Sequence, residues 1–117
     1  MSPTARTLAW LRSQGYAVAV VEHWNAFARR RIDAFGYLDL IAVHRAHRGV
    51  LGVQATSGAN VAHRVAKIAS IPEARTWLAA GNRIWVVGWR KIGPRGKRKK
   101  WEPLVRAIVE EDLGHDG

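Results

Sequence analysis

Three side chains in the middle of the chain have the types and the spacing to bind a hard cation. Asp39 opens a short apolar run, and Gln54 and Thr56 close the next one, within residues 37–57. If the two runs pair as a hairpin with Val43 opposite Val50, Asp39 lies opposite Gln54. Thr56, two residues on, shares that sheet face. A carboxylate, an amide oxygen and a hydroxyl would then converge, which predicts a divalent-metal phosphodiesterase site.

Further groups along the chain could complete such a site. Asp33 precedes Asp39 by six residues, so on one straight strand it would share the face but lie about 20 Å away, and only a bend at Gly36 would bring it close. Glu22 is expected on the neighbouring strand. Two cations on the helix expected over residues 61–69, Arg64 and Lys67, lie off its apolar face. The alternatives are a surface ion pair between Asp33 and the arginines before it, and a solvated or phosphate-binding helix face.

The charge of the chain points to a polyanionic partner. Nineteen Lys and Arg against nine Asp and Glu give a formal net charge of +10 in 117 residues. DNA or RNA is the simplest such partner, and an anionic membrane surface or an acidic protein are the alternatives. Three basic clusters would neutralise phosphates, although the last could also be a solvated loop. They are Arg29, Arg30 and Arg31; Arg45 and Arg48; and Arg95, Lys97, Arg98, Lys99 and Lys100.

The amino-acid composition excludes some kinds of metal site and of membrane protein. The chain has no cysteine, so disulfides and cysteine-ligated metals are excluded, in keeping with a reducing, cytoplasmic location. No apolar run approaches the roughly 18 residues of a membrane span, and no signal peptide is recognisable. Of six tryptophans, Trp10, Trp77 and Trp85 are expected in the core. Trp24, Trp89 and Trp101 flank basic loops and could stack on bases, pack in an oligomer interface or fill the core.

Hydrophobic periodicity and turn residues predict one domain over residues 1–117. Ser2 and Pro3 favour a helix start, and a capping box is expected at Ser70–Glu73. A helix between two strands implies a crossover, so we expect a mixed sheet flanked by helices. Helices are expected at 3–14, 61–69 and 72–80, and strands at 16–24, 32–44, 50–56, 83–89 and 101–111, with a basic connection at 25–33 and a basic loop before the last strand.

The order helix, three strands, helix, strand, with Asp39 at the second strand and Gln54-Ala55-Thr56 at the end of the third, resembles the PD-(D/E)XK nuclease superfamily. Within it, the chain is most similar to small Holliday-junction-resolvase-like proteins of phages or bacteria. The resemblance covers residues 4–89, with the basic loop 90–100 and the final strand appended. It implies a restriction-endonuclease-like α/β fold with an αβββαβ core.

The resemblance also implies roles for particular residues. Asp39 would take the place of the invariant acid and bind Mg²⁺, for which Mn²⁺ can substitute. Gln54 would replace the second acid, and the Ala55 carbonyl would be a backbone ligand. Thr56 stands where the family has lysine, a role that Lys67 could fill from the helix. Gln54 removes one negative charge, so the site should hold a cation less tightly.

The implied function is a metal-dependent DNA endonuclease, with selectivity for branched DNA and a homodimeric state as further options that rest on the resemblance alone. The alternative is a non-catalytic nucleic-acid-binding protein on a nuclease-like fold, which the two departures at Gln54 and Thr56 favour.

Overall fold

The protein has a mixed α/β fold built on one five-stranded sheet. The computed structural model describes residues 1–114. The sheet has the strand order β1-β4-β5-β6-β7, and a second, two-stranded sheet pairs β2 with β3. The helices are α1 (Pro3–Ser13), α2 (Val61–Ala69) and α3 (Pro72–Ala79). The strands are β1 (Ala17–Val20), β2 (His23–Asn25), β3 (Arg30–Ile32), β4 (Leu40–His44), β5 (His47–Ser57), β6 (Arg83–Ile92) and β7 (Lys100–Ile108).

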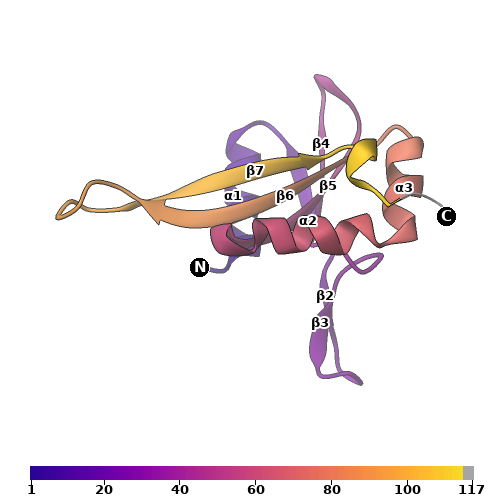
Figure 1. Cartoon of the computed structure of the whole chain (residues 1–117), viewed down its shortest axis with the longest axis horizontal. Helices are drawn as coiled ribbons and strands as arrows, with labels where there is room; N and C mark the ends of the chain where they lie inside the picture. The colour runs from indigo at the N-terminus through magenta and orange to yellow at the C-terminus, as the bar shows by residue number, and fades with distance from the viewer. Residues whose placement is uncertain (115–117) are drawn as a thin grey trace.

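Helices cover both faces of the large sheet (Figure 1). On one face, Leu11 of α1 packs in a cluster with Leu40, Leu51 and Val53. On the other face, Ile68 of α2 and Ala74 of α3 pack with Ile84 and Val86 of β6 and with Ile108 of β7. Because successive strand residues point to opposite faces, the near-continuous apolar run of β6 serves both clusters. Ile84 and Val86 face α2 and α3, whereas Val87 and Trp89 face α1.

The sheet is mixed, as the sequence predicts. β5 and β6 run parallel, and the crossover between them contains α2 and α3. The other neighbours in the large sheet are antiparallel. The central β4–β5 register also follows the prediction, with Leu40 opposite Val53 and Ile41 opposite Gly52. The predicted register, with Val43 opposite Val50, would place His44 opposite Gly49. Beyond Ala42 the register shifts and His44 pairs with His47, so the prediction is wrong at His44.

The helix boundaries follow from local chemistry, with one exception. The Ser2 hydroxyl caps α1 by accepting from the Ala5 N–H at 3.1 Å, and Gly15 with φ 92° follows its end. The predicted capping box at Ser70–Glu73 is wrong. The Ser70 hydroxyl donates to the Lys67 carbonyl at 2.7 Å and so belongs to the end of α2, and α3 begins at Pro72 without a side-chain cap.

Two predicted strands are each divided in the structure. The predicted strand 16–24 splits into β1 and β2, which lie in different sheets. The predicted basic connection at 25–33 is wrong at its two ends, because Asn25 belongs to β2 and residues 30–32 form β3. Of the predicted strand 32–44, residues 33–39 are a turn, and β4 begins only at Leu40. β2 and β3 pair with each other and form a two-stranded ribbon, residues 23–32, that projects from the body (Figure 1). The distal part of the β6–β7 hairpin, residues 90–101, projects as a second protrusion, which we call the arm (Figure 1).

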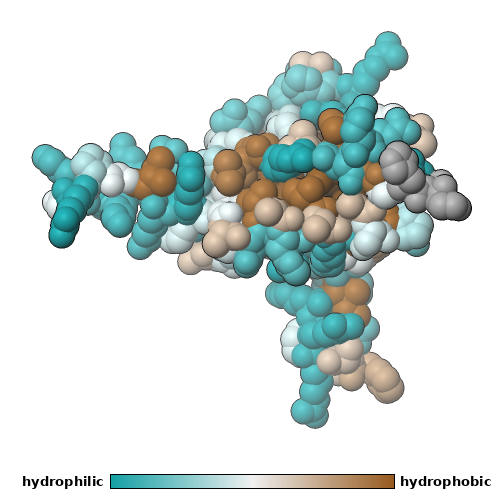
Figure 2. All heavy atoms as spheres, viewed as in Figure 1, coloured by the Kyte–Doolittle hydropathy of each residue, from teal (hydrophilic) through white to brown (hydrophobic). Residues whose placement is uncertain are grey.

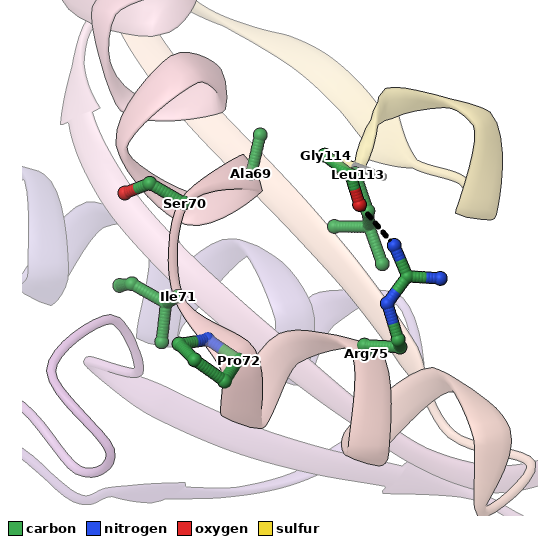
Figure 3. A pocket seen from close by; sticks show the side chains of 7 residues that line it. All are labelled: Ala69, Ser70, Ile71, Pro72, Arg75, Leu113 and Gly114. Carbon is green, nitrogen blue, oxygen red and sulfur yellow. Dashed lines mark hydrogen bonds between the residues drawn. The ribbon is translucent and has the colours of Figure 1, made fainter. Parts of the chain in front are cut away.

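The chain end is packed against α3 as far as Gly114. Leu113 is buried, the Gly114 N–H donates to the Ala69 carbonyl at 3.3 Å, and the Arg75 guanidinium donates to the Gly114 carbonyl (Figure 3). The polar, glycine-containing sequence of residues 113–117 predicts a frayed tail, and this prediction is wrong for residues 113–114. Residues 115–117 lie outside the described part. A hollow of about 260 Å³ lies at this junction, and among residues 1–114 no carboxylate side chain lines it. Within residues 1–114, no helix has the length and apolar character to cross a membrane.

Candidate functional site

Three carboxylates converge where the ribbon joins the large sheet. Each of Glu22, Asp33 and Asp39 offers one oxygen, and the three oxygens lie within 4.8 Å of one another. Asp39 is buried, with 4% of its surface exposed, and the other two are partly buried. Like charges at this separation repel one another, so such a cluster is stable only with bound protons, a cation or both.

The register of the ribbon brings Glu22 and Asp33 together. His23 pairs with Ile32, so the residues just before β2 and just after β3 are the next opposed pair. The Val21 and Glu22 N–H groups then donate to the Asp39 carbonyl, at 2.8 and 3.2 Å, which joins this pair to the start of β4. Asp33 and Asp39 therefore lie close together, as expected for a bend at Gly36 and not for a straight strand, which would separate them by about 20 Å.

A tight turn between β3 and β4 provides the bend that the sequence allowed at Gly36. The Gly36 N–H donates to the Asp33 carbonyl at 3.1 Å, and the Leu38 N–H donates to the Ala34 carbonyl at 2.9 Å. Phe35 and Gly36 have φ values of 54° and 81°. Only this left-handed pair lets the chain reverse within a few residues, and glycine adopts that conformation without steric cost.

Backbone contacts with β5 hold the Asp39 carboxylate in place. The Asp39 N–H donates to the Val53 carbonyl at 2.9 Å, and the Ala55 N–H donates to Asp39 Oδ2 at 2.8 Å. Burial raises the pKa of Asp39 to about 8, helped by a hydrogen bond to the Asp33 carboxyl and by the charges of Asp33 and Glu22, and opposed by the Ala55 N–H. At neutral pH the cation-free cluster therefore retains a proton on Asp39, which a bound cation would displace.

Gln54 lies in the cluster as predicted, but Thr56 does not. The Gln54 amide Nε2 donates to Asp33 Oδ2 at 3.2 Å, and its buried Oε1 has no hydrogen-bond partner among residues 1–114. An unpartnered buried acceptor is costly, and a ligated cation would satisfy it. Thr56 is buried on the same sheet face but does not line the cavity over the carboxylates. Its predicted catalytic role has no support from this position.

A cavity of about 210 Å³ opens over the carboxylates. Two arginines, Arg31 from the ribbon and Arg64 from α2, contribute to its wall, and Arg64 Nε has no hydrogen-bond partner in the described part of the chain. Lys67, one turn further along α2, places its Nζ 3.8 Å from Asp33 Oδ2. The cavity is lined by Pro3, Thr4, Glu22, Arg31, Asp33, Asp39, Gln54, Ala55 and Arg64.

The strand directions divide the basic clusters between two edges of the sheet. β5 and β6 both end at the edge where β1 ends and β4 begins, so the ribbon, the carboxylates and the arm share that edge. Arg29, Arg30 and Arg31 lie on the ribbon, and the exposed cations of residues 95–100 lie in the arm, whose surface is mostly hydrophilic (Figure 2). Arg45 and Arg48 lie at the β4–β5 tip, on the opposite edge from the carboxylates (Figure 1).

The tryptophans flanking the basic loops have different environments. Trp89 is buried, and its indole N–H donates to the Thr7 hydroxyl at 2.9 Å, so it is a core residue. Trp24 on the ribbon is 58% exposed. The Arg6 guanidinium lies over the ring of Trp101, at the start of β7, 3.9 Å from the ring centroid. Trp24 and Trp101 therefore remain candidates for base stacking, and Trp89 does not.

Comparison with known proteins identifies no relative of this chain. No family model matches the sequence, and neither a curated protein nor a solved structure matches it significantly. Only the arrangement of the chain's own residues therefore bears on its function.

Sequence reasoning missed two parts of this site. Pro3 and Thr4, at the start of α1, line the cavity, and no residue pattern indicated that. The pairing of Glu22 with Asp33 was also missed, although the sequence carried a signal for it. Asn25 favours a turn, and a hairpin centred between Phe27 and Ala28 opposes Glu22 to Asp33.

Proposed function

We propose that this protein is a metal-dependent endonuclease of the PD-(D/E)XK type that hydrolyses DNA phosphodiesters. The observation that carries the proposal is the convergence of the Glu22, Asp33 and Asp39 oxygens within 4.8 Å, at the sheet edge from which the ribbon and the arm project. Mg²⁺ is a hard cation that binds carboxylate oxygens, and Mn²⁺ accepts the same ligands. The orphaned Gln54 Oε1 adds a neutral oxygen to the set.

The three acids supply the negative charge that is missing because Gln54 is neutral. With Gln in place of a second acid on β5, Asp39 alone would give a weak site. Glu22 and Asp33 bring the number of carboxylates at the cluster to three, and Ala55 fixes Asp39 through its N–H. The predicted use of the Ala55 carbonyl as a ligand stays a prediction.

The surrounding cations have positions suited to phosphodiester hydrolysis. When bound, a divalent cation would polarise the phosphate and lower the pKa of a water molecule. Arg31 and Arg64 line the same cavity and can hold the phosphate oxygens. Lys67 Nζ, 3.8 Å from Asp33, can stabilise the negative charge that develops on the phosphate, a task that Thr56 cannot perform.

A cleavage assay on a panel of DNA structures tests the proposal. The pure protein is incubated with labelled linear duplex, single strand, flap and four-way junction in Mg²⁺, Mn²⁺ or EDTA. We expect cutting in either metal and none in EDTA. Glu22→Gln should slow cutting by at least about 100-fold, since even loss of an outer-shell partner of a metal ligand costs 10–100-fold. Glu111→Gln, an exposed carboxylate on the C-terminal turn, is the matched control and should cut normally.

The second candidate is a nucleic-acid-binding protein that does not cut. It is favoured by the contacts of Asp33, which accepts from the Gln54 amide and pairs with Lys67, so that this carboxylate is already partly neutralised. Tight binding of DNA with no cutting in any metal would support this candidate and contradict the nuclease. A homodimeric state stays a prediction.

The position of the arm predicts a measurable salt dependence. Lys97, Lys99 and Lys100 are exposed in the arm, and we expect replacement of all three by Gln to lower the slope of log K against log salt by up to about 3, at roughly 0.9 per phosphate contact. Fluorescence anisotropy with a duplex from 50 to 300 mM salt measures it. Arg45→Gln with Arg48→Gln, at the opposite sheet edge, is the control and should leave the slope nearly unchanged. An equal decrease of the slope in the arm variant and in the Arg45→Gln, Arg48→Gln variant would contradict a binding surface at the sheet edge that holds the carboxylates.

A further inference from the structure

The tip of the β2–β3 ribbon presents one aromatic ring entirely to solvent. Phe27 has a relative exposure of 101%, so its side chain makes no contribution to the packed core. Ala26 and Ala28 flank it and are too small to cover it. The Asn25 side-chain oxygen accepts from the Ala28 N–H at 2.8 Å and closes the turn around Phe27. The tip is therefore a locally ordered turn, and a large apolar group lies at its apex.

The rest of the ribbon carries aromatic and positive groups and no negative ones. Arg29, Arg30 and Arg31 are exposed, and Trp24, 58% exposed, pairs with Arg31 across the two strands. Residues 23–32 contain no acidic side chain, and the nearest acids are those of the site. Figure 2 shows hydrophobic and hydrophilic side chains side by side along this protrusion. An exposed apolar ring at the tip, followed along the ribbon by three arginines, fits a partner that offers both flat apolar surfaces and phosphates.

We propose that Phe27 stacks on a nucleic-acid base that is unpaired or easily unstacked, and that the ribbon thereby recognises branched or distorted DNA. This inference rests on the proposed binding of nucleic acid and gives it a substrate class. Base–aromatic stacking needs only a flat ring, so it accepts any base. In a perfect duplex every base is already stacked on its neighbours, and inserting a side chain requires unstacking them. A bulge or a branch point presents a base at lower cost.

The ribbon connects this ring directly to the carboxylates. Its two strands end at Glu22 and Asp33, the opposed acids of the cluster. Phe27 is five residues beyond Glu22, which corresponds to a reach of about 15 Å at the rise of an extended strand. Arg30 and Arg31 lie between the tip and the site, and Arg31 also lines the cavity. A base held at the tip would thus leave the adjoining backbone positioned along a row of arginines that ends at the carboxylates.

Binding measured in EDTA tests the inference without any need for cleavage. The probes are a perfect duplex and the same duplex with a single 2-aminopurine bulge, and affinity is followed by anisotropy and stacking by 2-aminopurine fluorescence. We expect wild type to prefer the bulged duplex and to quench the 2-aminopurine. Phe27→Ala should weaken binding of the bulged duplex by about 10-fold, and binding of the perfect duplex by less than about 2-fold.

Two further variants separate stacking from other effects. Phe27→Trp keeps a flat ring and should retain both the preference and the quenching. Phe35→Ala removes an exposed ring, 62% exposed, from the turn beside the ribbon and should behave as wild type. Thermal unfolding should be the same for Phe27→Ala and wild type, because the ring is outside the core.

Several results would overturn the inference. Equal affinity for the two duplexes in wild type, or an unchanged preference in Phe27→Ala, would show that the ring does not read bases. Loss of a dimer on Phe27→Ala in analytical ultracentrifugation would show instead that the ring packs against another protein copy. Quenching that depends on Phe27, in a protein that never cuts DNA, would sink the nuclease proposal and support the ribbon's role.

Discussion

Asp39→Asn is expected to abolish metal-dependent cutting and, in the same protein, to raise the stability of the metal-free fold at pH 8–9. Asn keeps an oxygen that can accept from the Ala55 N–H, and its amide can donate to the neighbouring Asp33. The substitution replaces a buried carboxyl group, whose ionisation the fold opposes, by a neutral amide. Cutting should fall by at least about 100-fold, since the variant loses a direct ligand rather than an outer-shell partner. The melting temperature at pH 8–9 in EDTA should rise by at least about 4 °C, the shift that about 1 kcal/mol produces in a domain of this size.

Asp112 is the matched control, because its replacement by Asn should lower the stability of the fold and leave cutting unchanged. The Arg106 guanidinium and the Val109 N–H hold the pKa of the Asp112 carboxyl below its usual range. Asp112→Asn should therefore lower the melting temperature at neutral pH while leaving cutting intact. Circular dichroism melts and the cleavage assay on both variants measure these effects. A destabilised Asp39→Asn protein, or one that cuts normally, would contradict the assignment of Asp39 as a buried metal ligand whose ionisation is unfavourable.

The stability of the metal-free protein should depend on pH through the same carboxyl group. Folding raises the pKa of Asp39 from 3.8 to about 8, so between these values the folded chain holds a proton that the unfolded chain has released. The unfolded state then binds fewer protons, and the free energy of unfolding contributed by Asp39 falls as the pH rises from about 4 to about 8. The total change is on the order of a few kcal/mol, at about 1.4 kcal/mol per pH unit.

Mg²⁺ or Mn²⁺ should reverse this loss of stability. A cation binds the ionised cluster, so its stabilising effect should be larger at pH 9 than at pH 6, and binding should release a proton near neutral pH. At a concentration 100-fold above the dissociation constant, the gain is about 2.7 kcal/mol. Melts at pH 6, 7.5 and 9 in EDTA or metal provide the measurement, and Asp39→Asn provides the reference that cancels the titration of all other groups. A metal effect that is equal in wild type and in Asp39→Asn would show that the cation binds elsewhere.

Local sequence rules predicted much of the scaffold. The helix at 61–69, the start of the first helix and the parallel crossover are all confirmed, because each depends on local signals or on chain connectivity. The register that pairs Leu40 with Val53 was also predicted correctly, since the apolar pattern of β4 and β5 determines which residues face the core, and it brings Asp39 and Gln54 to the same cavity. The register shift near His44 was not predicted, because a turn of two residues replaces the longer loop that the polar segment indicated.

The prediction failed where two segments left the large sheet. Residues 16–24 have the composition of one continuous strand and residues 25–33 that of a basic connection, and the turn signal at Asn25 does not by itself assign β2 and β3. β2 and β3 pair with each other because the turn at residues 26–29 reverses the chain between them, and the turn at Phe35 and Gly36 then leads the chain into β4. Pairing between segments is a non-local choice, which composition and periodicity do not encode.

The sequence by itself determined the charge, the helices, the mixed sheet and the position of Asp39 beside Gln54, because these follow from composition, period and connectivity. Only the tertiary structure decided which acids meet. It brought Glu22 and Asp33 to Asp39, moved Thr56 out of the cavity, and separated Arg45 and Arg48 from the site edge. The physical reason is that a cluster of charges depends on distances across paired strands, and a single tight turn changes those distances by more than the length of any side chain.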